Sequence, residues 1–396
     1  MKIAIIAYNH PESSLPLANY LCEFGNHVDY YFITRKNTVS TSSFNFQLAP
    51  KTLGIVNLTK ENIPEIYQLW ENTKVNFNLL RIFFLPFRTL PFINRFLQKI
   101  TIKKSLQQIN GQDYDIINFV GQAPFLKYLN KKTFAKAKIH SLHEVLPHYS
   151  KQRISRKFIN YLLKNRIPII VHSKTSFDAL KTYKASKRHN NAHCIPFGLF
   201  ETYNTIKSAN NLKDLNDFLL FYGRIKPYKG LSLLYDAMKV LETRGIEIPI
   251  VIAGAGIDNS LEKFAKLSNC YIFNTHLSNE ELVEMNLKAK AIVCPYSSAS
   301  QSGIVQTSFL FGKPVIATTV GAFPEIIFNN ENGLLINNNS SLELANAIEK
   351  IFTDNEFYEN LTNGVNQFTH KQKEFHWNSI SKKTNDLFLK LYHNEV

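Results

Sequence analysis

The sequence predicts an α/β protein built from two doubly wound domains, each a parallel sheet with helices on both faces. Three observations support this fold class. The chain of 396 residues is too long for one ordinary hydrophobic core. Short apolar runs alternate with amphipathic helical patterns almost throughout. The alternation is interrupted by the polar stretch 201–217, which is rich in Asn, Lys and Asp and typical of a linker.

The first half of the chain begins with a strand and its connecting helix. The run from Ile3 to Ala7 is continuously apolar, as expected for a strand buried on both faces. Leu17, Leu21 and Phe24 then recur on one helical face, and Gly25 ends that helix. Four further strands are expected in this half, at Val28–Ile33, Ile116–Val120, Ile139–Leu142 and Ile167–Val171.

The second half repeats the same architecture after the polar stretch. Its expected strands are Phe218–Tyr222, Pro249–Ala253, Tyr271–Phe273, Ala291–Cys294, Pro314–Ala317 and Gly333–Ile336. The last segment, Trp377–Tyr392, is helical in pattern. We therefore expect one domain at residues 1–200, a second at 201–377, and a C-terminal helix at 378–396 that crosses back to the first.

The composition limits the compartment. The apolar run at the N-terminus is too short for a signal peptide, and no stretch approaches the ~20 apolar residues of a membrane-spanning helix. The cysteines lack metal-ligand spacing and are interpreted as reduced core thiols; they are Cys22, Cys194, Cys270 and Cys294. These features predict a cytoplasmic protein.

The net charge of +15 makes nucleic acid, an anionic membrane and phosphorylated small molecules candidate partners. No zinc-finger, helix-turn-helix or RNA-binding motif accompanies the charge, so nucleic acid is not predicted. Residues 81–104 interleave aromatic and basic residues without an acid, and 151–166 are also basic. Both segments suit peripheral attachment to an anionic membrane, on the inner face of the cell membrane. A helix that covers the sheet with its basic residues outside remains an equal alternative.

The strongest chemical signal is the stretch 223–230, Gly-Arg-Ile-Lys-Pro-Tyr-Lys-Gly, which follows an expected strand. Ligands of open α/β sheets bind beyond the carboxyl ends of the strands, where Arg224 and Lys229 would lie. Two cations at this place suit a diphosphate. On spacing alone, two exposed basic residues in a turn are the slightly favoured interpretation.

A second signal is the small-residue stretch 297–308, which follows a strand and opens a helix. Free backbone N–H groups and the positive dipole end at a helix N-terminus form an anion-binding device. An ordinary serine-capped helix is the alternative.

These motifs resemble the family-4 retaining glycosyltransferases of the GT-B fold. The resemblance rests on stretches 223–230, 312–325 and 332–335, and is weaker in the first 200 residues. It implies two Rossmann-like domains facing across a cleft, and transfer of a sugar with retention from a UDP- or GDP-sugar, with no other cofactor and no metal. The acceptor would be a glycan or a lipid-linked molecule, in cell-surface polysaccharide or lipopolysaccharide biosynthesis.

The resemblance also implies the roles of particular residues. Arg224 and Lys229 match the pair that holds the donor diphosphate and stabilises the departing nucleotide, and His143 matches a histidine that reaches a hydroxyl of the transferred sugar. These three are the expected catalytic residues. The implied donor-binding residues are Gly223, Asn274, His276, Ser300, Gln301, Ser302, Gly303, Ile304 and Thr307.

The chain departs from the family at two glutamates that are normally eight residues apart. Ala299 or Ser300 stands at the first position, and Thr307 or Ser308 at the second. The Gln-Ser-Gly sequence at 301–303 resembles a subset of the family that lacks the pair. The loss leaves an alternative function open, a catalytically degenerate partner subunit that binds a nucleotide sugar.

Overall fold

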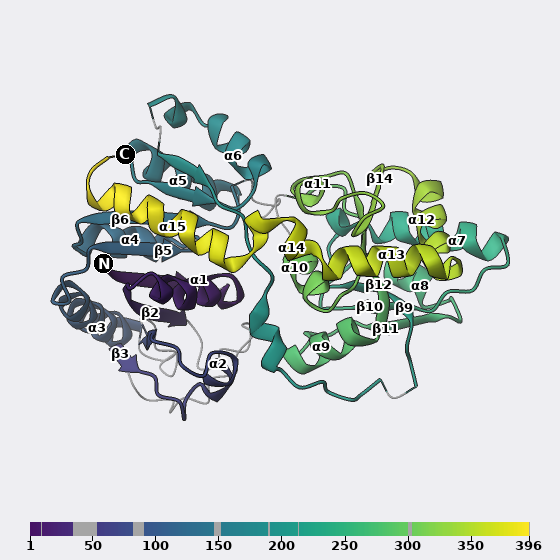
Figure 1. Cartoon of the computed structure of the whole chain (residues 1–396), viewed down its shortest axis with the longest axis horizontal. Helices are drawn as coiled ribbons and strands as arrows, with labels where there is room; N and C mark the ends of the chain where they lie inside the picture. The colour runs from purple at the N-terminus through teal and green to yellow at the C-terminus, as the bar shows by residue number, and fades with distance from the viewer. Residues whose placement is uncertain are drawn as a thin grey trace. The chain divides into compact units, whose positions relative to one another are not determined.

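The computed structural model describes residues 1–8, 10–34, 54–81, 91–145, 152–188, 191–212, 214–299 and 303–395. The chain forms two compact units. Unit 1 comprises Met1–Thr205 together with Glu374–Val396, and unit 2 comprises Ile206–Lys373 (Figure 1). Each unit is an α/β sandwich around one sheet, so the predicted fold class of two parallel-sheet domains is confirmed.

The sheet of unit 1 has eight strands in the order β3-β4-β2-β1-β5-β6-β7-β8. The strands are β1 (Lys2–Tyr8), β2 (His27–Thr34), β3 (Gly54–Asn57), β4 (Asn76–Arg81), β5 (Ile116–Val120), β6 (Ala137–Leu142), β7 (Ile169–Val171) and β8 (Ala192–Cys194). Strand β3 pairs antiparallel with β4, and the other described pairs are parallel. The chain order reverses beside β1, which pairs with both β2 and β5, and open α/β sheets bind ligands at such a point.

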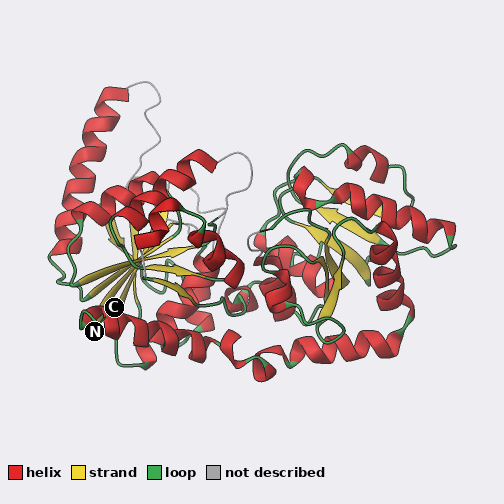
Figure 2. Ribbon diagram, turned by 90° about the horizontal axis from the view of Figure 1, so that it is seen from above, coloured by secondary structure: helices red, strands yellow, loops and turns green. Residues whose placement is uncertain are grey.

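Two layers of helices cover this sheet, which Figure 2 shows edge-on between them. Side chains of β1 point alternately into two core clusters, Ile3 and Ile5 into one and Ala4 and Ile6 into the other, which explains its continuous apolar run. The first cluster includes residues of α1 (Pro11–Glu23), α2 (Pro64–Leu69) and α15 (Trp377–Tyr392). The second includes residues of α3 (Pro91–Asn110), α4 (Pro124–Lys132), α5 (Gln152–Lys164) and α6 (Lys174–Lys181). The short 3₁₀ turns are η1 (Lys184–Arg188), η2 (Glu201–Thr205) and η4 (Lys373–Phe375).

Specific contacts fix helix α15 on unit 1. The indole Nε1 of Trp377 donates to the carbonyl of Leu199 (2.8 Å), and Asn26 Nδ2 donates to Asn385 Oδ1 (2.8 Å). A Cβ atom on Gly198 would lie 2.6 Å from the Trp377 ring. The absence of a side chain at Gly198 is therefore what lets the indole approach the backbone.

We expect Gly198→Ala to destabilise the protein by about 1–3 kcal/mol, because the new methyl group overlaps the Trp377 ring. The loss should be smaller when Gly198→Ala is made in a Trp377→Phe background, since the closest atoms belong to the indole. Chemical denaturation of the two single variants and the double variant measures this coupling. Strictly additive losses would contradict the assigned contact.

The sheet of unit 2 has six parallel strands in the order β11-β10-β9-β12-β13-β14. The strands are β9 (Phe218–Tyr222), β10 (Ile250–Ala253), β11 (Cys270–Phe273), β12 (Ala289–Cys294), β13 (Val315–Thr318) and β14 (Gly333–Ile336). The helices are η3 (Pro227–Lys229), α7 (Leu231–Thr243), α8 (Ser260–Phe264), α9 (Asn279–Lys288), α10 (Gly303–Leu310), α11 (Phe323–Ile326), α12 (Ser341–Thr353), α13 (Asn355–Asn366) and α14 (Phe368–Lys371). The strand order reverses beside β9, which pairs with both β10 and β12.

All the strands predicted from apolar runs are present, with bounds that differ by no more than about two residues. Strands β3, β4 and β8 were not predicted. The placement of Phe24 on the buried helix face is wrong: the chain turns at Gly25 (φ 74°), and Phe24 is 42% exposed. Cys194 is exposed at the end of β8 and is not a core thiol. None of the helices in the described ranges combines the length and apolar character that a bilayer-spanning segment needs.

Candidate functional site

The predicted diphosphate-binding turn lies at the carboxyl end of β9, and glycines hold it against the turn after β10. The N–H of Gly223 donates to the carbonyl of Ala253 (2.9 Å), and the N–H of Ile225 donates to that of Ala255 (3.1 Å). A Cβ atom on Gly254 would overlap the carbonyl oxygen of Gly223, and one on Gly256 would overlap that of Ile225. The glycines after β10 therefore position the backbone of the turn that carries Arg224.

The two predicted cations of this turn have different surroundings. Arg224 is exposed, whereas Lys229 is 9% exposed on η3. Lys229 Nζ donates to the hydroxyl of Tyr296 (2.6 Å) and lies 3.8 Å from the centre of the Tyr296 ring. Gly230 has a φ of 76° and touches the backbone after β12, where a Cβ atom would overlap the carbonyl oxygen of Pro295. The structure thus brings Lys229 to the carboxyl end of β12, through a tyrosine that no sequence pattern had singled out.

The start of helix α10 lies beside the same turn. Tyr222 donates from its hydroxyl to the carbonyl of Ile304 (3.4 Å), and the Cδ1 atom of Ile304 lies 3.5 Å from the position of a Cβ on Gly223. Gly303 is the first residue of the helix. The preceding predicted residues, Ser300, Gln301 and Ser302, lie outside the described residues.

The polar residues inside α10 are buried. Thr307 donates from its hydroxyl to the carbonyl of Gly303 (3.0 Å), and Ser308 donates to that of Ile304 (2.7 Å). The Oε1 atom of Gln306 is buried without a hydrogen-bond partner among the described residues. At the position of the family's second glutamate, the hydroxyls of Thr307 and Ser308 thus donate within their own helix. The polar atom without a partner is the side-chain amide oxygen of the neighbouring Gln306.

Asn274 and His276 follow the edge strand β11, and both side chains are exposed. Asn274 Oδ1 accepts from the N–H of Gly256 (3.1 Å), which ties the end of β11 to the glycine turn after β10. The Nδ1 atom of His276 lies 3.1 Å from the carbonyl of Leu277. The described site residues of unit 2 therefore follow four adjacent strands, β11, β10, β9 and β12, at their carboxyl ends.

In unit 1, His143 lies within a cluster of aromatic rings at the carboxyl ends of the strands. Its ring stacks on His10 (4.2 Å between centroids, 16° between planes) and lies 4.9 Å from Phe197 and 5.4 Å from His172. These residues follow β1, β8 and β7, respectively. The sequence did not single out His10 or His172, although His172 directly follows a strand as His143 does. That shared position is the signal that could have found it.

The protonation of this cluster follows from its contacts. Because a carbonyl oxygen can only accept, His172 carries its proton on Nδ1, which donates to Ile195 (2.9 Å). Burial lowers the pKa of His172 to about 3. Burial, with the nearby rings of His10 and His172, also holds the pKa of His143 well below its usual value. His143 is therefore a neutral hydrogen-bonding group at physiological pH.

The ring of His143 stacks face to face on that of His10 and lies at a tilt to that of His172. Over the described ranges, no group of three or more His, Cys, Asp or Glu side chains is placed to hold a metal ion. Asp115, in the Asp-Tyr-Asp sequence 113–115, forms an ion pair with Lys136 (2.9 Å).

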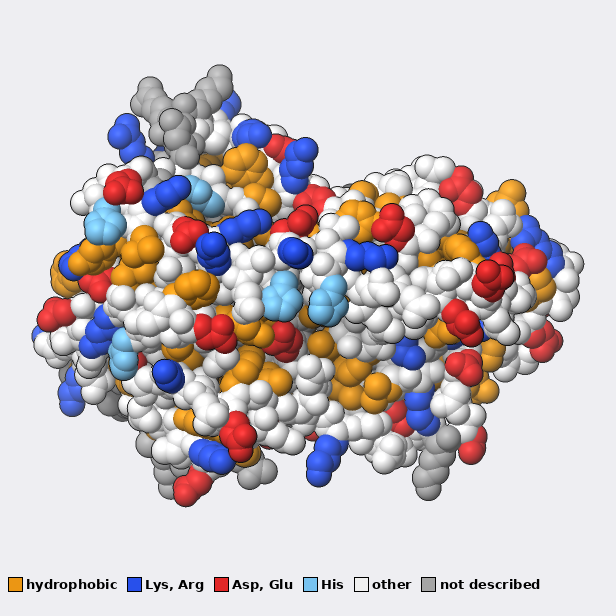
Figure 3. All heavy atoms as spheres, viewed as in Figure 1, with side chains coloured by type: hydrophobic (Ala, Val, Ile, Leu, Met, Phe, Trp, Pro, Cys, Tyr) orange, Lys and Arg blue, Asp and Glu red, His pale blue; other side chains and the backbone are white. Residues whose placement is uncertain are grey.

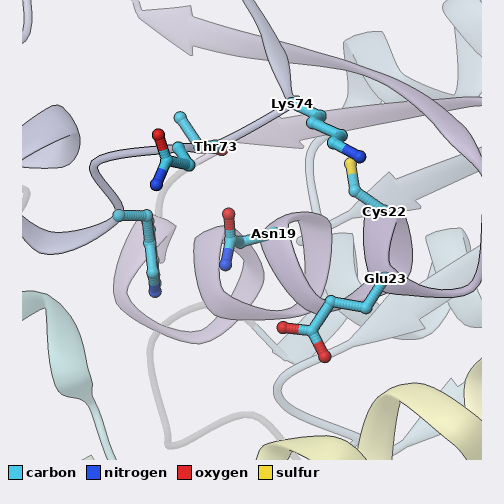
Figure 4. A pocket seen from close by; sticks show the side chains of 7 residues that line it. Asn19, Cys22, Glu23, Thr73 and Lys74 are labelled. Carbon is cyan, nitrogen blue, oxygen red and sulfur yellow. The ribbon is translucent and has the colours of Figure 1, made fainter.

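A cavity of about 260 Å³ lies elsewhere in unit 1, between the last turns of α1 and the segment 70–74 (Figure 4). Asn19, Cys22 and Glu23 line it from α1, and Thr73 and Lys74 from the segment before β4. Helix α1 leads from the carboxyl end of β1 to the amino end of β2. Its last turns therefore lie near the amino ends of the strands, whereas His143 lies at their carboxyl ends. This cavity is separate from the histidine cluster.

A neighbouring histidine gives a prediction about pH. His140 of β6 is fully buried, stacks on Phe119 (4.9 Å), and neither ring nitrogen has a partner among the described residues. Burial lowers the pKa of His140 to about 3. The unfolded chain therefore binds a proton at His140 below about pH 6.5, whereas the folded protein does not, and the free energy of unfolding falls as the pH is lowered from 6.5 toward 3. When the pH is lowered from 7 to 4.5, we expect the free energy of unfolding of His140→Phe to fall by about 2–3 kcal/mol less than that of the wild type.

Urea denaturation at the two pH values measures this difference. His276→Gln is the control, because that side chain is exposed. An unchanged pH dependence in His140→Phe would contradict the assignment of a buried neutral histidine.

Comparison with known proteins finds a family match for part of the chain. Residues 202–368 match the family model of the glycosyl transferases group 1. An uncharacterised glycosyltransferase of Methanocaldococcus jannaschii is 28% identical over 169 residues, 41% of this chain and 44% of the relative, so the match covers less than half of each. The O-antigen chain mannosyltransferase C of Escherichia coli is 26% identical over 64% of this chain and 69% of its own length.

Solved structures match over nearly the whole chain. Sucrose-phosphate synthase of Thermosynechococcus elongatus has a TM-score of 0.70 at 17% identity and covers 100% of both chains. HepE of Anabaena, solved in complex with UDP and glucose, has a TM-score of 0.63 at 16% identity and covers 98% of this chain and 100% of its own. At these identities the similarity shows the fold. Residues 202–368 thus match the glycosyl transferases group 1 model, in a chain whose two parallel-sheet units have the GT-B fold.

Proposed function

We propose that the protein transfers a sugar, with retention, from a UDP- or GDP-sugar to a glycan or lipid-linked acceptor in the synthesis of cell-surface polysaccharide or lipopolysaccharide. The proposed compartment is the cytoplasm, and the proposed family is family 4, in the subset with Gln-Ser-Gly at 301–303. The observation that carries the proposal is the turn of Arg224 and Lys229 beside the start of α10, within the segment that matches the family model. The E. coli relative named for an O-antigen chain and the neighbour solved with UDP support the substrate classes.

The proposed role of unit 2 is to hold the donor. The two cations stabilise the negative charge that develops on the diphosphate as it leaves, and the N-terminus of α10 adds backbone N–H groups. Lys229 is held in place because its ammonium donates to Tyr296, which leaves little freedom for the side chain to reorganise during the reaction. Asn274 and His276 are proposed to lie beside the nucleotide base.

The proposed transfer needs no protein nucleophile. The acceptor hydroxyl attacks the anomeric carbon on the face from which the nucleotide departs, so a new C–O bond forms as the bond to the phosphate oxygen breaks. The acceptor proton passes to an oxygen of the leaving diphosphate. His143, which is neutral, is proposed to hydrogen-bond a hydroxyl of the transferred sugar. No metal takes part in this proposal.

The second candidate is a partner subunit that binds a nucleotide sugar without turning it over. One observation favours it: at the position of the family's second glutamate, the hydroxyls of Thr307 and Ser308 are bonded within their own helix. Each hydroxyl can still accept a hydrogen bond, but neither carries the charge of the carboxylate that it replaces.

Donor turnover distinguishes the two functions. The full chain is incubated with a panel of UDP- and GDP-sugars, with and without acceptor extracts, while released nucleotide is measured and the anomer of the product is read by NMR. Release of nucleotide with one donor, and a product of the same anomeric configuration, is expected. Thermal stabilisation by a donor without any release would favour the partner subunit.

A further inference from the structure

The positive charge of the chain belongs to one unit. Unit 1 holds 31 Lys and Arg against 14 Asp and Glu, a net charge of +17, whereas unit 2 holds 15 against 17, a net charge of −2. The anionic donor is proposed to bind unit 2. The charge on unit 1 therefore has to be explained by something other than the donor.

Within unit 1, three helices concentrate this charge. Helices α3, α4 and α5 contain 11 Lys and Arg and no Asp or Glu in 42 residues. Leu106, Leu126 and Ile159, one from each helix, belong to the same core cluster, so the three helices cover the same face of the sheet. The face that carries α1 and α15 is different, because acidic and basic side chains lie side by side on it (Figure 3).

Hydrogen bonds join the three helices into one surface. Asn110 at the end of α3 donates from Nδ2 to the carbonyl of Lys132 (3.0 Å), and its Oδ1 accepts from the N–H of Phe134 (2.8 Å). Tyr161 of α5 donates from its hydroxyl to Asn130 Oδ1 on α4 (3.0 Å). We call the outer surface formed by α4, residues 100–110 of α3, residues 156–164 of α5 and Phe134 the basic face.

Exposed aromatic side chains lie among the cations of this basic face. Phe134 is 71% exposed and Tyr128 is 45% exposed, next to Lys131 and Lys132. Lysines near a helix C-terminus are favoured by the helix dipole, which accounts for their charge but not for the exposure of a phenyl ring beside them. Among described side chains, no ion pair neutralises a lysine of α4.

We propose that the basic face docks unit 1 on an anionic membrane surface, with Phe134 and Tyr128 at the boundary between lipid and water. Cations that form no ion pair attract anionic head groups, and aromatic rings favour the interfacial region. A membrane fits better than nucleic acid, because no nucleic-acid-binding motif accompanies these residues. The segments predicted from sequence, 81–104 and 151–166, contribute α3 and α5, although residues 82–90 lie outside the described ranges, and α4 is an addition from the structure.

Vesicle binding by the full chain tests the proposal. Co-sedimentation is compared between vesicles of phosphatidylglycerol with phosphatidylcholine and vesicles of phosphatidylcholine alone. Each lysine near an anionic surface contributes about fivefold to partitioning, so Lys127→Gln/Lys131→Gln/Lys132→Gln should weaken binding about 100-fold. Phe134→Ser should also weaken binding while leaving its dependence on salt unchanged, because the phenyl ring carries no charge.

The matched control is Lys263→Gln/Lys266→Gln/Lys371→Gln, which removes the same charge from unit 2. It should bind vesicles within about twofold of the wild type, because these lysines lie off the basic face. Equal losses in the two triple variants, equal binding to neutral vesicles, or displacement from vesicles by duplex DNA would overturn the proposal. Arg224→Ala should bind vesicles like the wild type, so a failure of the proposed reaction is distinguishable from a failure of membrane docking.

Discussion

Arg224→Ala is expected to lower the rate of sugar transfer about 100- to 1,000-fold without unfolding the protein. Arg224 is exposed at the carboxyl end of β9, so its removal leaves no cavity, and stability should change by less than about 0.5 kcal/mol. The activity is lost because the positive charge at the leaving diphosphate is lost. Nucleotide release under saturating donor measures the effect, and circular dichroism verifies the fold.

Lys226→Ala is the matched control for this prediction. Lys226 is an exposed cation two residues further along the same turn, and the resemblance gives it no role. It should retain activity within about threefold of the wild type, since a screened surface charge contributes little. Equal losses in the two variants would show that the general charge of the turn matters rather than the guanidinium. Wild-type activity in Arg224→Ala would refute the proposed site.

Gly230→Ala is expected to destabilise unit 2 by about 2–4 kcal/mol and to abolish donor binding. Two costs combine at this position. The backbone has a φ of 76°, which disfavours any side chain, and a Cβ atom would overlap the carbonyl oxygen of Pro295. Relief requires the turn to move away from the loop after β12, and this separates Lys229 from Tyr296.

Gly245→Ala provides a control for the backbone cost alone. Gly245 has a φ of 70°, and a Cβ atom there would have no atom within 4 Å. It should therefore cost only about 1 kcal/mol and leave donor binding unchanged. Denaturant unfolding and a thermal-shift titration with the nucleotide sugar measure both quantities. Similar losses in the two variants would contradict the contact between the turn and Pro295.

The sequence predicted the strands best where they are buried on both faces. Runs such as Phe218–Tyr222 are continuously apolar because both faces of a parallel strand lie against helices, and this pattern is visible without a structure. Two of the three strands that were not predicted, β3 and β8, are short and lie at the two edges of the sheet. Strand β3, for example, has an exposed residue at one end and, among the described strands, pairs only with β4. Its apolar signal is correspondingly weak.

The residues of the candidate site divide in the same way. The positions of Arg224, Lys229 and His143 after strands could be predicted, because strand ends are local in sequence. Their roles came from the resemblance and remain predictions. Tyr296 could not be predicted, because its relevance depends on a contact across 67 residues of chain with Lys229. Such contacts arise only when neighbouring strands of a sheet bring distant loops together.

By itself the sequence determined the fold class, the order of the strands along the chain and the chemical types of the site residues, because hydrophobic periodicity and turn residues are local properties. Only the tertiary structure decided which loops meet. It placed Lys229 against Tyr296, stacked His143 on His10, and assembled α3, α4 and α5 into one basic face. The physical reason is that the order of strands within a sheet and the packing of helices on it depend on contacts between distant residues, which no local pattern specifies.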